Sequence, residues 1–192
     1  MKKSLIALLV AAGFFVMVLG WGVSTSNQLV SLDEGVKEKW SQVENVYQRR
    51  LDLIPNLVNT VKGYAKHEAQ VLEAVTQARA QVGQVRVNTL QDLPKFDQAQ
   101  SQLTQALSRL LMVSEKYPEL KADQGFLELQ SQLEGTENRI TVERMRFNES
   151  ARSYNTYLKS FPQSLIAEFR RFHERPYFQA DTAAKTAPKV EF

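Results

Sequence analysis

The chain has 192 residues, with 24 Lys and Arg against 21 Asp and Glu, and it contains no cysteine. Two of its three net positive charges are Lys2 and Lys3, so the rest is close to neutral and shows no basic run. This balance argues against nucleic acid as a partner, because its binding depends on clustered Lys and Arg. Without cysteine the chain has no thiolate metal ligand and no cysteine for a lipid anchor.

The N-terminus opens on an apolar segment. Ser4 to Val23 form twenty positions without a charge, and a helix of that length rises about 30 Å, the thickness of a bilayer's hydrocarbon core. Trp21 lies near its end, where an aromatic ring suits the headgroup boundary. The alternative is a cleaved signal peptide, whose apolar region usually spans about 7–15 residues before a small-x-small site. Gly20-Trp21-Gly22 is a poor version of such a site, so we predict an uncleaved transmembrane anchor within residues 1–23.

The basic residues that flank this segment predict its orientation. Lys2, Lys3 and the terminal amine lie on one side, whereas Lys37 and Lys39 on the other side stand among acidic residues. The positive-inside rule then places the N-terminus in the cytoplasm and the bulk of the chain outside, as a single-pass protein of the cell (inner) membrane. Because the bias is small, the opposite orientation stays open.

Beyond the anchor, apolar residues recur every three or four positions, as they do along one face of an amphipathic helix. The first helix is expected to continue through Pro55 and to end at Lys62-Gly63, with Gly63 as a left-handed cap. Asp92, two residues before Pro94, is typical of a helix start. The four apolar stripes span residues 29–61, 71–85, 96–117 and 126–158. The predicted breaks are 63–66, 83–93, Tyr117-Pro118 with the polar stretch 121–125, and Phe161-Pro162.

The lengths of these helices constrain their topology. At 1.5 Å per residue they measure roughly 58, 30, 35 and 60 Å. Two short helices between two long ones close as an up-down-up-down bundle, and the seven-residue spacing favours a left-handed twist. The predicted fold is therefore all-α, an N-terminal transmembrane helix followed by an antiparallel four-helix bundle. Its predicted parts are the anchor at 1–23, the bundle at 24–161, a short amphipathic segment at 162–178 and a flexible tail at 179–192.

Several motifs resemble the LemA family of bacterial membrane proteins. They are Gln48-Arg49-Arg50-Leu51-Asp52-Leu53-Ile54-Pro55-Asn56-Leu57-Val58, Val61-Lys62-Gly63-Tyr64-Ala65, His67-Glu68, Tyr117-Pro118-Glu119-Leu120-Lys121-Ala122, Leu133-Glu134-Gly135-Thr136-Glu137-Asn138-Arg139-Ile140 and Arg175-Pro176-Tyr177-Phe178. The resemblance covers nearly the whole chain, although residues 83–97 match no motif of the family. It implies an anchored four-helix bundle and supplies no catalytic residues to carry over.

Catalytic and metal-binding motifs find little support in this sequence. The only histidines are His67 and His173, and the residues after His67 lack the second histidine of a zinc-protease motif. Glu134 and Glu137 lie one turn apart and could share a metal, but di-metal bundles need Glu-x-x-His pairs that this chain lacks. We therefore predict no enzyme activity, no catalytic residue, no metal site and no cofactor.

Four charged residues are predicted to form a cluster between helices. In an antiparallel pairing of the first and fourth helices, Arg49 and Arg50 fall level with Glu134 and Glu137. Such a structural polar cluster would set the register in the middle of the bundle. The alternative is that all four are unrelated solvent-facing charges, each contributing well under about 1 kcal/mol. Rescue of Arg50→Glu by Glu134→Arg would favour the pairing.

The C-terminal segment has an amphipathic pattern of its own. Residues 161–192 hold six of the eighteen aromatic residues, with basic residues interleaved. If the fourth helix returns toward the membrane, this segment would lie on lipid beside the anchor. The alternative, a cap folded over the open end of the bundle, fits the pattern equally well. The predicted membrane-interface residues are Trp21, Phe161, Phe169, Phe172, Arg170 and Arg171.

Together these features predict a non-enzymatic, membrane-anchored helical scaffold or adaptor. Its partners would be the lipid bilayer and an unidentified membrane or envelope protein, with its oligomeric state left open. Gln98, Gln102 and Gln105 on the third helix are either contact residues or simply solvated. The alternative function is a membrane-associated sensory or lipid-responsive module whose C-terminal segment docks and undocks.

Overall fold

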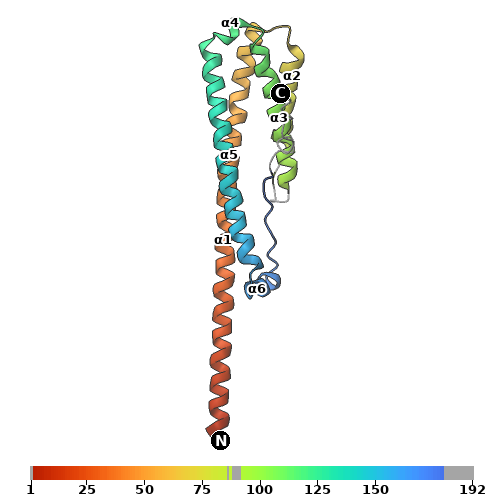
Figure 1. Cartoon of the computed structure of the whole chain (residues 1–192). Helices are drawn as coiled ribbons and strands as arrows, with labels where there is room; N and C mark the ends of the chain where they lie inside the picture. The colour runs from red at the N-terminus through yellow and green to blue at the C-terminus, as the bar shows by residue number, and fades with distance from the viewer. Residues whose placement is uncertain (1, 86, 88–91, 180–192) are drawn as a thin grey trace, which may run out of the picture. The chain divides into compact units, whose positions relative to one another are not determined.

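The computed structural model describes residues 2–85, 87 and 92–179. This part of the chain contains helices and no strand, which confirms the predicted all-α class (Figure 1). The helices are α1 (Lys2–Tyr64), α2 (Ala69–Gln84), α3 (Leu93–Ser114), α4 (Pro118–Lys121), α5 (Gln124–Lys159) and α6 (Gln163–Phe169). Apart from Gln179, the predicted flexible tail lies outside the described residues.

α1 begins in the apolar segment and continues without a break through the following amphipathic stripe. Its most apolar stretch of 18 residues has a mean hydropathy of 2.4, and none of that stretch is buried. A helix that is apolar on all sides, with no protein packed around it, suits the interior of a membrane. Among the described residues, α1 is the one helix long and apolar enough to cross a membrane.

The helix ends differ from the sequence predictions at two places. α1 runs through Pro55 as predicted, but Gly63 lies inside its last turn and has no left-handed conformation, so the predicted Gly63 cap is wrong. The helical turn continues because Ala65, just beyond α1, is completely buried, and its N–H donates to Val61 O at 2.8 Å. The second difference is α4, a single turn that begins at Pro118, where a proline suits the first helical position.

Two compact units divide the chain between them. The first comprises Met1–Trp40 and Glu149–Arg175, and the second comprises Ser41–Asn148 and Pro176–Phe192. α1 and α5 are therefore shared, with one part of each helix in each unit. In the first unit the fully buried side chains come from both helices and include Leu29, Val36, Ala151 and Tyr154.

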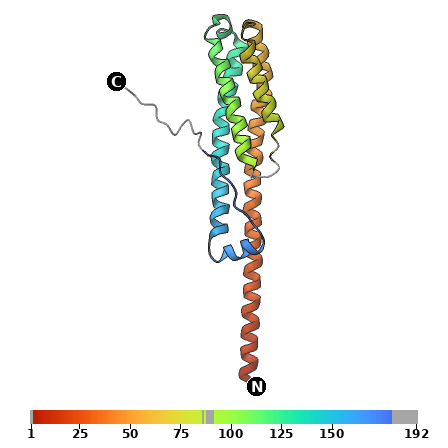
Figure 2. The ribbon, with the colours of Figure 1, turned by 90° about the vertical axis from the view of Figure 1, so that its right-hand side faces the viewer.

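The hydrophobic core of the second unit is built from five helices, among which α2 and α3 lie side by side (Figure 2). Its members on each long helix recur at spacings of three or four residues, the periodicity from which the helices were predicted. Each fully buried Leu, Ile or Phe in such a core contributes about 1.5–3 kcal/mol. The core includes Ile54, Leu57 and Val61 from α1, Leu72 and Val75 from α2, Leu103, Leu107 and Leu110 from α3, Leu120 from α4, and Phe126 and Leu133 from α5.

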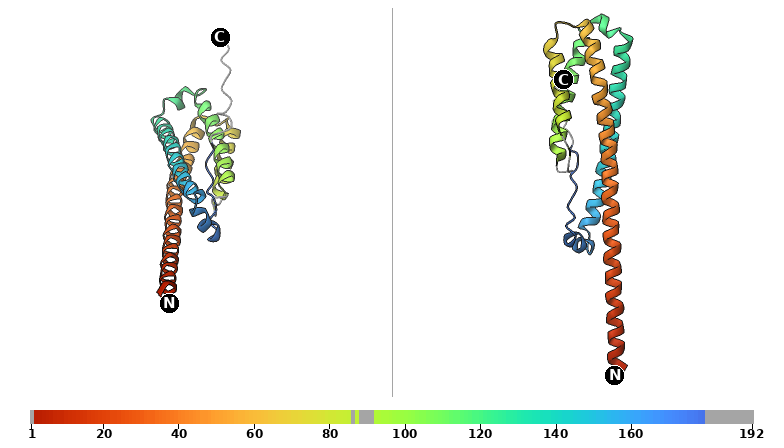
Figure 3. Two further views of the ribbon diagram at one scale, coloured as in Figure 1. Left: turned by 60° about the horizontal axis from the view of Figure 1, so that its bottom comes forward. Right: turned by 180° about the vertical axis from the view of Figure 1, so that it is seen from behind.

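A left-handed residue lies just beyond the end of α6, and the chain then becomes extended. Arg171 has a φ of 58° and donates its N–H to Glu168 O at 3.0 Å, while Phe172 N–H donates to Ala167 O at 2.9 Å. This pair of hydrogen bonds is the usual closure of a helix whose next residue is left-handed, a position that glycine occupies most easily. From residue 172 to 179 the backbone has no regular secondary structure, and Figure 3 shows this stretch as a ribbon without helical turns.

Candidate functional site

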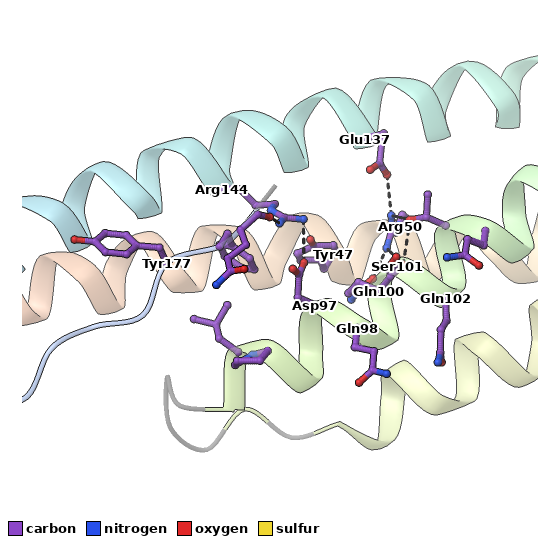
Figure 4. Close-up of a pocket in the computed structure, with 16 residues that line it drawn as sticks. Tyr47, Arg50, Asp97, Gln98, Gln100, Ser101, Gln102, Glu137, Arg144 and Tyr177 are labelled. Carbon is purple, nitrogen blue, oxygen red and sulfur yellow. Dashed lines mark hydrogen bonds and ion pairs between the residues drawn. The ribbon is translucent and has the colours of Figure 1, made fainter. Parts of the chain in front are cut away.

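Arg50 of α1 is only 2% exposed in the second unit, although its guanidinium group is charged. Its Nη1 donates to Glu137 Oε2 at 2.7 Å and to Thr104 Oγ1 at 3.1 Å (Figure 4). Its Nη2 donates to the backbone carbonyl of Gln100 at 3.5 Å and to the Oε1 atom of the same residue. The guanidinium carbon also lies 5.2 Å from the ring centre of Tyr47. A buried charge is tolerated only when it is paired and hydrogen-bonded, so these partners account for its burial.

Two of the four predicted cluster residues, Arg50 and Glu137, are brought together, and the other two are not. Arg49 and Glu134 are exposed and form no ion pair within the described residues. Glu134 Oε1 instead accepts a hydrogen bond of 3.0 Å from Gln130 Nε2 on its own helix. The counter-charge of Arg50 is thus Glu137 rather than Glu134. That this pair sets the register of the helices stays a prediction.

Gln100 is a member of this cluster that sequence reasoning missed. It is 2% exposed and lies four residues after Phe96 and three before Leu103, both of which are buried. A glutamine in phase with an apolar stripe was the available signal. Two buried donors, Arg50 Nε and Gln100 Nε2, have no acceptor within the described part of the chain. Since a buried donor without an acceptor costs about 1–3 kcal/mol, both N–H groups favour any added acceptor that reaches them.

These residues line an open cleft of about 630 Å³ in the second unit (Figure 4). Its walls carry two ion pairs, Arg50 with Glu137 at 2.7 Å and Arg144 with Asp97 at 3.0 Å, so the four charges balance. A neutral, amide-rich surface suits hydrogen bonding to polar groups without a net charge. The amide and hydroxyl side chains that α3 contributes are Gln98, Gln100, Ser101, Gln102, Thr104 and Gln105.

Tyr47 adds an aromatic ring to the same cleft. The ring packs edge-on against Phe96, with 5.0 Å between the ring centres and an angle of 85° between the ring planes. Burial raises the pKa of Tyr47, and the positive charges of Arg144 and Arg50 oppose that shift. The phenol therefore stays neutral at physiological pH and can both donate and accept a hydrogen bond.

The extended C-terminal segment also forms part of the cleft wall. Phe178 is buried, packs edge-on against Phe147 with 5.4 Å between ring centres, and lies 4.5 Å from the guanidinium carbon of Arg144. The Asn148 side chain holds the backbone of Phe178, accepting from its N–H at 2.9 Å and donating to its carbonyl at 3.0 Å. Arg144 Nη2 donates to the carbonyl of Gln179 at 2.9 Å. The second unit thus binds an extended backbone through side-chain amide and guanidinium groups.

The first unit holds the preceding part of this segment in the same way. Asn155 accepts from Arg175 N–H at 2.8 Å and donates to Arg175 O at 2.8 Å, and the hydroxyl of Tyr154 donates to His173 O at 3.0 Å. The Arg175 guanidinium pairs with the buried carboxylate of Asp33, with Nε to Oδ1 at 2.7 Å. Burial raises the pKa of Tyr154, helped by the negative charge of Asp33 and opposed by Arg175.

The sequence pattern left open a C-terminal cap over the end of the bundle, but it did not predict that residues 175–178 would be held through their backbone, although they form a motif that resembles the LemA family. The sequence contains one weak indication of this contact. Asp33 lies four residues after Leu29 and three before Val36, so an acidic residue interrupts an apolar stripe. A buried acid at such a position needs a basic partner, which the half-buried Arg175 supplies.

The six predicted membrane-interface residues all lie in the first unit. Phe161 and Phe169 are 80% and 84% exposed, Arg170 and Arg171 are exposed, and Trp21 and Phe172 are half-buried. Elsewhere on α6, Ile166 is half-buried, and its Cδ1 lies 3.6 Å from the position that a Cβ on Gly22 would take. α6 therefore packs beside α1 at the end of the apolar segment.

The residues considered for metal binding do not form a common site in the described part of the chain. His67 and His173 are both exposed, and Glu137 is paired with Arg50. Across residues 2–85, 87 and 92–179, no three or more His, Asp or Glu side chains are grouped so that they could hold a metal ion.

Comparison with known proteins places this fold in a family. A model of the LemA family matches residues 39–192. The chain belongs to the LemA family. Protein LemA of Metamycoplasma hominis is 22% identical over 171 residues, covering 87% of this chain and 76% of that protein. Magnetosome protein MamQ 2 of Paramagnetospirillum magneticum and MamQ of Magnetospirillum gryphiswaldense are each 25% identical over 181 residues, covering 83% of this chain and 66% of the relative.

The LemA family match confirms the resemblance seen in the sequence motifs. It begins at Lys39, so it contains Arg50, Gln100, Glu137 and the docked segment up to Phe178, and it leaves out the apolar segment. The chain spans 66% of the length of the MamQ proteins, and the rest of each lies outside the match. Neither the LemA nor the MamQ name is that of an enzyme.

Proposed function

We propose that this LemA-family chain is a non-enzymatic, membrane-anchored helical scaffold or adaptor. In this proposal Ser4–Val23 crosses the inner membrane once, with the N-terminus in the cytoplasm. The long helices then form an antiparallel, left-handed up-down-up-down bundle outside it. The proposal is supported by the fully exposed apolar part of α1 and by the core that α1, α2, α3 and α5 share in the second unit.

The cleft around Arg50 is the observation that carries this proposal. In an adaptor, it would dock an extended segment of a partner protein. The buried N–H groups of Arg50 and Gln100 need acceptors, and every peptide unit offers a carbonyl oxygen. At the same cleft, Asn148 and Arg144 already hold an extended backbone, that of residues 178 and 179. The balanced charges and the glutamines of α3 suit a neutral peptide better than a free ion.

Photo-crosslinking of the full-length protein in native membranes tests the docking site. A photoreactive residue in place of Gln102, in the cleft, should yield a discrete crosslinked protein, whereas one in place of Gln70, exposed on α2, should not. Gln100→Met removes, at similar volume, the buried donor Nε2 together with the acceptor that Arg50 uses, so it should weaken the Gln102 product at least about fivefold, the effect of one hydrogen bond. Products that are identical at both positions, or unchanged by Gln100→Met in a correctly folded variant, would contradict the adaptor proposal.

A lipid-responsive module is the second candidate, and one observation favours it. Phe161 and Phe169 are almost fully exposed in the unit that contains the anchor. Large apolar side chains left in water in this way mark a surface that binds something apolar. Docking and undocking of α6 on lipid would then be the signal that the module transmits.

The proposed orientation can be tested by cysteine labelling, because the chain has no cysteine of its own. With the N-terminus inside, a single cysteine at the exposed Glu73 of α2 should react with a membrane-impermeant maleimide in intact spheroplasts. A cysteine in place of Lys3 serves as the control and should react only after lysis. The reverse pattern would place the domain in the cytoplasm.

A further inference from the structure

α6 exposes large apolar side chains in the first unit. Phe161, Leu165 and Phe169 are 80%, 57% and 84% exposed. Leu165 and Phe169 lie four residues apart, so they share one face of α6, and Phe161 lies two residues before α6 begins at Gln163. Three such side chains within nine residues form an apolar surface, and its exposure to water is unfavourable.

The other side of α6 is packed against protein. Ala167 is buried and Ile166 is half-buried, with Ile166 beside Gly22 of α1. Gly22 is the next-to-last residue of the uncharged segment Ser4–Val23. If that segment crosses the bilayer, α6 is held at the level of the membrane surface, where aromatic side chains partition well.

Basic residues follow directly after this apolar face. Arg170 and the left-handed Arg171 follow the last residue of α6, and both are exposed. Lys159 is paired with Glu174 at 2.7 Å, so the two arginines outweigh Glu168, the remaining acid of α6, by one charge. An apolar face bordered by arginines is the composition of a segment that lies in the headgroup region, with a modest preference for anionic lipid.

We propose that α6 and Phe161 form an interfacial foot that inserts into the outer boundary of the same bilayer the anchor crosses. Phe161, Leu165 and Phe169 enter the region between headgroups and acyl chains, and Arg170 and Arg171 remain among the headgroups. The foot depends on the proposed transmembrane anchor but not on the adaptor function. In the lipid-responsive alternative, α6 would be the part of the protein that binds lipid.

Site-directed spin labelling of the full-length protein in lipid nanodiscs tests this proposal. Single cysteines at Leu165, Ala12 and Val30 each carry a nitroxide, and collisions with bilayer-soluble oxygen are compared with collisions with a water-soluble nickel chelate. Ala12 lies within the span, whereas Val30 is an exposed apolar residue of α1 that lies roughly 12 Å beyond Gly22. The oxygen-to-nickel ratio at Leu165 should be at least about threefold that at Val30 and should approach the ratio at Ala12.

A second variant separates insertion in lipid from burial in protein. Phe161→Ser with Phe169→Ser should lower the ratio at Leu165 to that of Val30, with the ratio at Ala12 unchanged. The foot is refuted by a Leu165 label that nickel reaches as readily as it reaches Val30. It is equally refuted by a label shielded from both reagents, which would indicate a protein contact. A water-exposed Ala12 label would overturn the anchor itself, and the foot with it.

Discussion

Removing Glu137 alone should destabilise this protein more than removing both Arg50, its buried partner, and Gln100, which accepts a hydrogen bond from Arg50. Glu137→Ala leaves the guanidinium of Arg50 buried without a counter-charge, which we expect to lower the free energy of unfolding by about 2–4 kcal/mol. Arg50→Met with Gln100→Met removes the charge and its buried acceptor together. Because apolar replacement of a buried ionic group is often close to neutral, we expect that double variant to cost under about 1.5 kcal/mol.

Urea unfolding of the full-length protein in detergent, followed by far-UV circular dichroism, measures this difference. Glu134→Ala is the matched control: Glu134 lies one turn away on α5 and accepts a hydrogen bond from Gln130 of the same helix, and the variant should stay within about 0.5 kcal/mol of the wild type. Equal losses for Glu134→Ala and Glu137→Ala would show that the ion pair contributes nothing to stability. The charge-swap test also moves to the observed pair, Arg50→Glu with Glu137→Arg.

Asp33→Ala should release the C-terminal segment from the first unit without unfolding the helices. Arg175 then loses the carboxylate that holds its guanidinium, whereas its backbone bonds to Asn155, the bond from Tyr154 to His173 and the Lys159–Glu174 ion pair remain. We expect a local loss of about 2 kcal/mol, so the Arg175 amide should exchange with solvent roughly thirtyfold faster. Hydrogen–deuterium exchange of the full-length protein measures this rate, with the amides of α5 as an internal reference.

Glu34→Ala provides the control for that experiment. Glu34 is exposed and pairs with Lys37 at 2.6 Å, as Asp33 does at 3.2 Å, but it makes no bond to Arg175. Its removal should leave the exchange of the Arg175 amide unchanged. If both variants speed that exchange equally, the charge balance near Lys37 controls the exchange rate of the Arg175 amide, and the Asp33–Arg175 ion pair does not.

The helices were predictable because each buries one face in a shared core. Spacings of three and four residues carried the first helix correctly through Pro55, where a local rule would have ended it. The same local rules failed at Gly63, because the burial of Ala65 decides where the helical turn ends. Tertiary packing thus overrode a capping preference of about 1 kcal/mol.

The Arg50–Glu137 part of the polar cluster was predictable because it depends on the lengths of the helices. The positions of Arg50 and Glu137 along two long helices follow from the helix lengths and the loop positions. Gln100 and Thr104 belong to α3, and their approach to Arg50 depends on how that helix is rotated about its own axis. An amphipathic pattern sets that rotation too coarsely to choose among neighbouring polar residues.

The docked C-terminal segment was not predictable from periodicity. Asn148 and Asn155 bind backbone groups of Phe178 and Arg175, and backbone N–H and C=O groups are the same in every residue. A segment held in this way needs no apolar repeat, so residues 172–179 show none.

Two contacts of α1 with the C-terminal segment lie eleven positions apart, at Gly22 beside Ile166 and at Asp33 with Arg175. Eleven residues make just over three complete turns, so both positions share one face of the helix. A single inserted or deleted residue between them would turn one contact about 100° away from the other, whereas a substitution would leave their phase intact. The residue count of the stretch between these two contacts is thus restricted, whereas its composition can vary at exposed positions but not at the buried Thr25 and Leu29.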